Sequence, residues 1–155
     1  MKVIDVVFED FVNYKKPSMV IEFPYCTFKC NHECGKNICQ NYQLKDSEVL
    51  ELEPDDLISE YSKDPVTEAV VMQGLEPFDS MDDVIIFIDR FRGSFDDDIV
   101  IYTGYNEDEI DVSSLKKYKN IIVKYGRYIP GQTPHFDKEL GVMLYSDNQY
   151  SKRIS

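Results

Sequence analysis

Short apolar runs alternate along the chain with longer segments in which apolar residues recur at helical spacing. Four runs rich in β-branched and aromatic residues predict strands: "SMVIEFP" (18–24), "EAVVMQ" (68–73), "DIVIYTG" (98–104) and "NIIVKYG" (120–126). Because these runs are almost continuously apolar, they predict strands that are buried on both faces, as in a mainly parallel sheet.

The segments between the strands predict helices. "EPDDLISEYSKD" (53–64) has an acidic first turn followed by apolar residues at helical spacing. "SMDDVIIFIDRFRG" predicts a helix with Ser80 as N-cap, Asp83 three residues later and Gly93 as the stop. "NEDEI" (106–110) predicts the start of a short helix. This alternation of strands and helices predicts an α/β fold with a mainly parallel sheet.

Composition sets the class of protein. The chain has 155 residues, of which 43% are hydrophobic, and this length predicts a single domain spanning residues 1–155. Seventeen basic and twenty-nine acidic residues give a formal charge of −12, which disfavours nucleic acid as a partner. The acidic run "FDDDI" (95–99) is expected to form a solvated turn.

The N-terminus and the hydropathy of the chain bear on its location. The opening segment "MKVIDVVFEDFV" carries acidic residues within its apolar stretch and therefore does not match a signal peptide. No run approaches the roughly 18 apolar residues that a membrane-spanning helix needs. We therefore expect a cytoplasmic protein without a membrane partner.

All four cysteines of the chain lie within one loop, residues 26–41: Cys26, Cys30, Cys34 and Cys39. In a reducing cytosol such a cluster indicates metal ligands rather than disulfides. Four thiolates would suit a tetrahedral zinc ion or a closed iron–sulfur cluster. Three thiolates would instead leave one iron of a 4Fe–4S cluster open to a small ligand. The spacing alone leaves these alternatives open.

The unusual segments all follow predicted strands. The cysteine loop follows the first run, and "QGLEP" (73–77), "TGY" (103–105) and "YGRYIPGQ" (125–132) come at or after the ends of the next three. Ligands of parallel sheets gather at the carboxyl ends of the strands. The sequence therefore predicts that four strand ends share one site.

The cysteine loop resembles the cysteine motif of the radical S-adenosylmethionine enzymes. Cys26-x3-Cys30 matches the first half of that motif, and Cys39-Gln40-Asn41 matches its "C-x-N" ending, with residues 31–38 as a lengthened loop. The resemblance implies a 4Fe–4S cluster held by Cys26, Cys30 and Cys39, with Cys34 as the alternative third ligand. It also implies S-adenosylmethionine as the second cofactor.

A second segment, "QGLEPFDS" (73–80), resembles the "GGEP" segment of the same superfamily, with leucine in place of the second glycine. The resemblance implies contacts to the methionine moiety of S-adenosylmethionine: Gly74, Leu75 and Glu76 at its amino group, and Thr103, Gly104 and Tyr105 along the methionine or adenosine part. No constellation for acid–base or nucleophilic catalysis is found, so no catalytic residue is expected beyond the cluster.

Three further segments are similar to the activating proteins of anaerobic ribonucleoside-triphosphate reductase. These are "TGY" with its acidic continuation, "VKYGRYIPGQ" (123–132), which resembles "DGRF", and "SDNQYSKRI" (146–154), which resembles "SSNQR". The resemblance covers residues 19–154. It implies an incomplete TIM-like barrel of the radical S-adenosylmethionine type, and a glycyl radical made on anaerobic ribonucleotide reductase or another glycyl-radical protein. A low-potential donor such as flavodoxin or ferredoxin would supply the electron.

Two other functions stay open at this point. The chain could be a radical S-adenosylmethionine enzyme that modifies a different peptide or protein. It could also be a zinc-binding interaction protein without catalysis, in which all four cysteines hold the ion.

Overall fold

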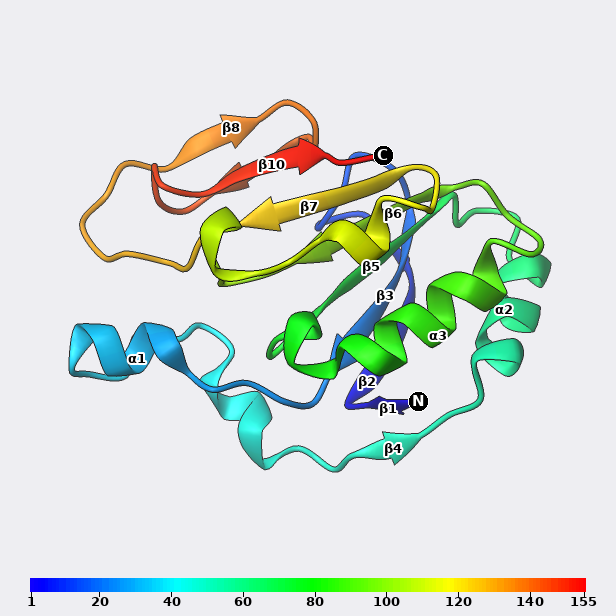
Figure 1. Cartoon of the computed structure of the whole chain (residues 1–155), viewed down its shortest axis with the longest axis horizontal. Coiled ribbons are helices and arrows are strands. Elements are labelled where there is room, and N and C mark those ends of the chain that lie inside the picture. Colours follow the sequence, from blue (N-terminus) through cyan, green and yellow to red (C-terminus); the bar gives the residue numbers. More distant parts are fainter.

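The computed structural model describes residues 1–155 as one α/β domain built on a six-stranded sheet (Figure 1). The strands run in the order β10-β7-β6-β5-β3-β2. Their bounds are β2 (Asp5–Asp10), β3 (Ser18–Phe23), β5 (Ala69–Gly74), β6 (Asp98–Tyr102), β7 (Ile121–Tyr125) and β10 (Tyr150–Arg153). The central four strands are parallel, and they are the four strands predicted from the apolar runs.

The two outer strands, β2 and β10, pair antiparallel with their neighbours and do not pair with each other. The sheet therefore stays unclosed, as expected for an incomplete barrel. Two small sheets accompany it, β1 (Lys2–Val3) with β4 (Leu50–Glu51) and β8 (His135–Asp137) with β9 (Val142–Leu144).

Three α-helices connect the strands: α1 (Lys29–Cys34), α2 (Pro54–Lys63) and α3 (Met81–Phe91). Four 3-10 helices complete the secondary structure: η1 (Tyr42–Asp46), η2 (Pro77–Ser80), η3 (Glu107–Glu109) and η4 (Ser113–Leu115). No helix has both the length and the apolar character that crossing a bilayer requires.

Apolar side chains cover both faces of the parallel strands, which explains why their sequences lack polar alternation. On one face Ile21, Met72 and Ile101 belong to a core that includes the buried residues of α2 and α3. On the other face Val71 and Val100 pack in a cluster with residues around the β8–β9 hairpin. Figure 1 shows α2 and α3 side by side on one side of the sheet, with β8 on the other.

The N-terminal capping predicted for α3 is wrong, whereas the helix ends before Gly93 as predicted. Ser80 immediately precedes the helix, but its side chain makes no capping hydrogen bond, and the Asp83 carboxylate accepts from the backbone N–H of Lys2 at 2.9 Å instead. The reason is that η2 runs directly into α3. The side chain of Glu76 caps η2 by accepting from Phe78 N at 3.1 Å. Gly93 lies beyond the last helical residue, and Arg92 occupies the C-cap.

The acidic run 95–99 is only partly the solvated turn that its charge predicts. Asp96 is exposed, but Asp98 is 7% exposed at the start of β6. Its carboxylate accepts hydrogen bonds from Lys16 Nζ at 2.6 Å, Arg153 at 2.9 Å and the Tyr14 hydroxyl at 3.0 Å. Segments distant in sequence supply these partners, and they allow a charged side chain to be buried.

Candidate functional site

The carboxyl ends of β3, β5, β6 and β7 border one cavity of about 260 Å³. Every residue predicted for the site lies in its lining: Cys26, Cys30, Cys39, Gly74, Leu75, Glu76, Thr103, Gly104 and Tyr105. Cys34 does not line the cavity and is exposed at the end of α1. The strand ends therefore meet as the parallel-sheet rule predicts, with three thiols on the cavity wall and the fourth outside.

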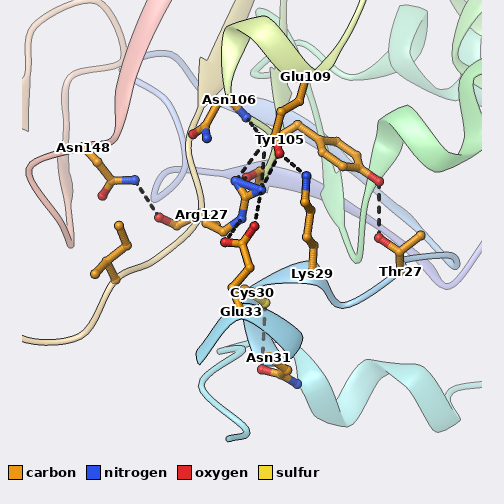
Figure 2. Close-up of polar contacts among 12 residues, drawn as sticks. Thr27, Lys29, Cys30, Asn31, Glu33, Tyr105, Asn106, Glu109, Arg127 and Asn148 are labelled. Carbon is orange, nitrogen blue, oxygen red and sulfur yellow. Dashed lines mark hydrogen bonds and ion pairs between the residues drawn. The ribbon is translucent and has the colours of Figure 1, made fainter. Parts of the chain in front are cut away.

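The side chain of Asn31 organises the lengthened cysteine loop. Its Oδ1 accepts the backbone N–H groups of Ile38 and Cys39, each at 2.9 Å, and lies 3.8 Å from the thiol of Cys30 (Figure 2). The side chain of the first residue of the insertion, Asn31, thus binds the backbone at its other end. The insertion closes on itself, so that Cys39 returns to the cavity beside Cys30.

All four cysteines are free thiols, and burial raises the pKa of two of those on the cavity wall, Cys26 and Cys30. Burial raises the pKa of Cys26 to about 12, although Phe28 N donates to its sulfur at 3.2 Å. Burial, and then the neighbouring Cys39 thiol, raise the pKa of Cys30. Since the thiolate is the metal ligand, binding of a metal centre here would release protons from these groups.

The donor set fits an iron–sulfur cluster better than a single ion. No group of three or more His, Cys, Asp or Glu side chains is placed to hold one metal ion. A 4Fe–4S cluster distributes its thiolates over separate irons, so they need to share a cavity rather than converge on one point. A four-thiolate site would require Cys34, which lies outside the cavity.

The glycine at the end of β5 has a structural reason. Gly74 has φ +103°, and a Cβ there would lie 2.7 Å from Phe23 N of the adjacent β3. Its carbonyl oxygen accepts a hydrogen bond from Asn41 Nδ2 at 3.0 Å. Asn41, the last residue of the "C-x-N" ending, therefore fastens the cysteine loop to the end of β5.

Glu76 connects the end of β5 to the turn after β6. It is 3% exposed, and its carboxylate accepts from Gly104 N at 2.9 Å and from Phe78 N at 3.1 Å. Burial raises the pKa of Glu76 to about 7, against the hydrogen bonds from Gly104, Thr103 and Phe78, which lower it. A carboxylate has further lone pairs, so it can still accept from a ligand.

Tyr105 closes the "TGY" turn toward the cysteine loop. Its hydroxyl donates to Asp79 at 2.8 Å and lies 3.3 Å from the hydroxyl of Thr27. Thr27 N donates to the same Asp79 carboxylate at 3.1 Å. The predicted short helix that follows is the 3-10 helix η3, whose capping box joins Asn106 and Glu109.

Two buried basic residues of the cavity, Lys124 and Arg127, were given no role in the sequence prediction. Lys124 is 7% exposed, and its ammonium donates only to Gly126 O, at 2.7 Å. Burial lowers the pKa of Lys124 to about 8. Arg127 is also buried and forms ion pairs with Glu33 and Glu109. The sequence did carry a signal for Lys124, because it is the one charged residue within the apolar run 120–126. Burying a single charge in a strand is costly, so such a residue is a candidate for a functional role.

The β8–β9 hairpin supplies the remaining wall of the cavity. Residues 142–145 line it, and Met143 and Tyr145 are also about half exposed, at 51% and 58%. Neither strand has more than three residues, and their sequences carry no alternation that would have predicted them.

Comparison with known proteins agrees with the chemistry of the cavity. A model of the 4Fe-4S single cluster domain family matches residues 22–142, which is more than three quarters of the chain. The chain belongs to this family, and the domain is typical of radical S-adenosylmethionine activating enzymes. No curated protein and no solved structure matches the chain.

Proposed function

We propose that this member of the 4Fe-4S single cluster domain family cleaves S-adenosylmethionine reductively and generates a glycyl radical on anaerobic ribonucleoside-triphosphate reductase. The observation that carries the proposal is the cavity, in which three free thiols meet the segments after three further strands. The order of those segments along the chain resembles the activating proteins of that reductase, which supports the choice of target.

Cys26, Cys30 and Cys39 would hold the cluster. When bound, a cluster with an open iron supplies an electron to the sulfonium of S-adenosylmethionine, and methionine and a 5′-deoxyadenosyl radical are the expected products. The chain itself binds and orients the two cofactors, and its buried walls limit the access of water to them.

The charged residues of the cavity suit an amino-acid moiety. Lys29, Lys124 and Arg127 are the basic residues of the lining, and only Lys124 lacks a carboxylate within ion-pair distance. We assign Lys124 to the carboxylate of the methionine moiety and Glu76 to its amino group. Each charge of the ligand would then face an opposite charge in a site of low dielectric constant.

An unclosed sheet suits a macromolecular substrate. The sheet ends in two separate edge strands, and the exposed side chains of Met143 and Tyr145 border the cavity. A glycine-bearing segment of a folded partner would approach over this apolar rim. The charge of −12 favours partners, including the electron donor, that present basic surface at the contact.

The proposal is tested with anaerobically reconstituted protein, a strong reductant and S-adenosylmethionine, with and without the cognate reductase. We expect 5′-deoxyadenosine and methionine in both cases, and an organic radical signal split by one glycine α-hydrogen when the reductase is present. Cys30→Ala serves as the control and should give neither product.

The outcomes separate the alternatives. Cleavage of S-adenosylmethionine without a radical on the reductase would contradict the proposed target and favour modification of another peptide or protein. Binding of one zinc ion without labile sulfide would contradict the enzymatic proposal altogether.

A further inference from the structure

Helix α1 carries Cys30 but buries none of its residues. Thr27 and Asn41, on either side of α1, attach the ends of the cysteine loop to Asp79 and Gly74. Two other contacts are internal to the loop: the rings of Phe28 and Tyr42 pack edge to face at 5.2 Å, and Asn31 binds the backbone of Ile38 and Cys39. These contacts determine the shape of the loop. They do not attach α1 to the sheet.

The attachment of α1 is electrostatic. Lys29 and Glu33 lie on either side of Cys30, and each meets an opposite charge that follows a strand of the sheet (Figure 2). Lys29 donates to Glu109 in η3, and Glu33 pairs with Arg127 after β7 at 3.1 Å. The helix is therefore held from two strand ends at once.

Glu109 and Arg127 also bind each other. The guanidinium of Arg127, 8% exposed, donates to both carboxylate oxygens of Glu109 at 2.8 and 2.9 Å. Asn106 N donates to the same carboxylate at 2.8 Å, which ties Glu109, the last residue of η3, to the N-cap of that helix. Such a bidentate, charge-assisted pair is strong and has a defined geometry. The pair therefore holds two opposite charges in fixed positions, where Lys29 and Glu33 of α1 bind them.

We propose that Glu109 is a positioning residue that holds α1, and with it the thiol of Cys30, against the carboxyl ends of β6 and β7. Without the Glu109 carboxylate, Lys29 loses its ion-pair partner, and Arg127 retains Glu33, which is half exposed, and the carbonyl oxygen of Gly104. The helix has no buried side chain to keep it in place, so it would separate from the cavity more often. This inference concerns the chain itself and does not require the proposed reaction.

The test measures the alkylation rate of each cysteine by iodoacetamide in the full chain before reconstitution, resolved by peptide mass spectrometry. Glu109→Gln is compared with Glu107→Gln. Glu107 lies in the same 3-10 helix and binds Lys152 and Tyr150, but it touches no residue of the cysteine loop. Exposed Cys34 is the internal control.

We expect Glu109→Gln to raise the rates at Cys30 and Cys39 about tenfold, as loss of a charge-assisted contact predicts, and Glu107→Gln to leave them unchanged. Cys34 should react at the same rate in all variants. High salt should accelerate Cys30 in the unsubstituted chain, because the pairs of Lys29 and Glu33 are partly exposed and screened.

A second variant keeps the proposal testable if Glu109→Gln unfolds the chain. Lys29→Met removes one of the two ionic contacts of α1 and leaves the Glu109–Arg127 pair intact. We expect an increase of about threefold at Cys30, in line with a partly exposed ion pair. Unchanged Cys30 rates in the folded variants would overturn the proposal. So would equal acceleration of Cys34, because that result indicates general destabilisation.

Discussion

Substitution of Gly74 by alanine tests the close approach of β5 to β3 beside the cavity. Gly74 has φ +103°, and an added Cβ would lie 2.7 Å from Phe23 N and 2.9 Å from Phe23 O. Both are backbone atoms of the paired strand, so no side-chain rotation can relieve the contact. One of the two strands must move.

The cost has two parts. A non-glycine residue in such a backbone conformation costs roughly 1–3 kcal/mol. Forcing an extra carbon into packed surroundings typically costs about 1–3 kcal/mol more. We therefore expect Gly74→Ala to lower the free energy of unfolding by about 2–6 kcal/mol, a large share of the stability of an ordinary domain.

Urea unfolding of the full chain measures this loss, and Gly131→Ala separates its two parts. Gly131 also has a positive φ, +82°, but no atom lies within 4 Å of an added Cβ, so this variant should lose only the conformational part, roughly 1–3 kcal/mol. Equal losses in the two variants would refute the close approach of the strands.

Three further predictions concern the thiols and two buried charges. Cys34→Ala should keep the cluster and the cleavage activity, whereas Cys39→Ala should lose both, as measured by metal analysis and by an assay of the products. The reverse result would show that Cys34, and not Cys39, is the third ligand of the cluster. Lys124→Met should raise the free energy of unfolding by about 1 kcal/mol because it removes a buried charge without a carboxylate partner, and it should weaken binding of S-adenosylmethionine about tenfold. The folded pKa of Lys124 is about 8 and its ordinary value is 10.5, so between these values the unfolded chain binds the proton more strongly than the folded chain. The free energy of unfolding of the unsubstituted chain should therefore increase as the pH rises from about 8 to 10.5, and that of the variant should not; identical pH profiles would contradict this. Asp98→Asn should lower the free energy of unfolding by about 1–2 kcal/mol at neutral pH. The loss would be larger if the charged partners of Asp98 were fully buried, but the side chains of Lys16 and Arg153 are each more than a third exposed, and solvent screens their interaction with the carboxylate. Although burial opposes ionisation, hydrogen bonds lower the pKa of Asp98, so the difference should be complete above the ordinary value of 3.8 and vanish as pH falls through the folded pKa; a difference that persists in strong acid would count against it.

The parallel strands could be predicted because their sequences are apolar on both faces, which only a covered strand tolerates. The outer strands could not. In β2 the exposed and half-buried residues alternate, and β10 reads "YSKR". Such short polar strands form because a neighbouring strand offers unpaired backbone groups, and this depends on tertiary context.

The location of the site followed from the same parallel arrangement, since strand ends in one sheet converge. What the sequence could not provide was the contacts between those ends. The burial of Lys124 depends on which side of β7 is covered by the β8–β9 hairpin. The pairing of Glu109 with Arg127 joins segments 18 positions apart through side-chain geometry alone.

The central claim is that three of the four thiols hold a 4Fe–4S cluster with one iron open to S-adenosylmethionine. The most direct measurement is the electron paramagnetic resonance spectrum of anaerobically reconstituted, dithionite-reduced protein before and after addition of S-adenosylmethionine. We predict a cluster signal from about four irons and four sulfides per chain, and a clear shift of that signal on addition of the ligand, both retained in Cys34→Ala. A cluster signal that S-adenosylmethionine leaves unchanged, or a cluster that is lost with Cys34, would contradict the claim.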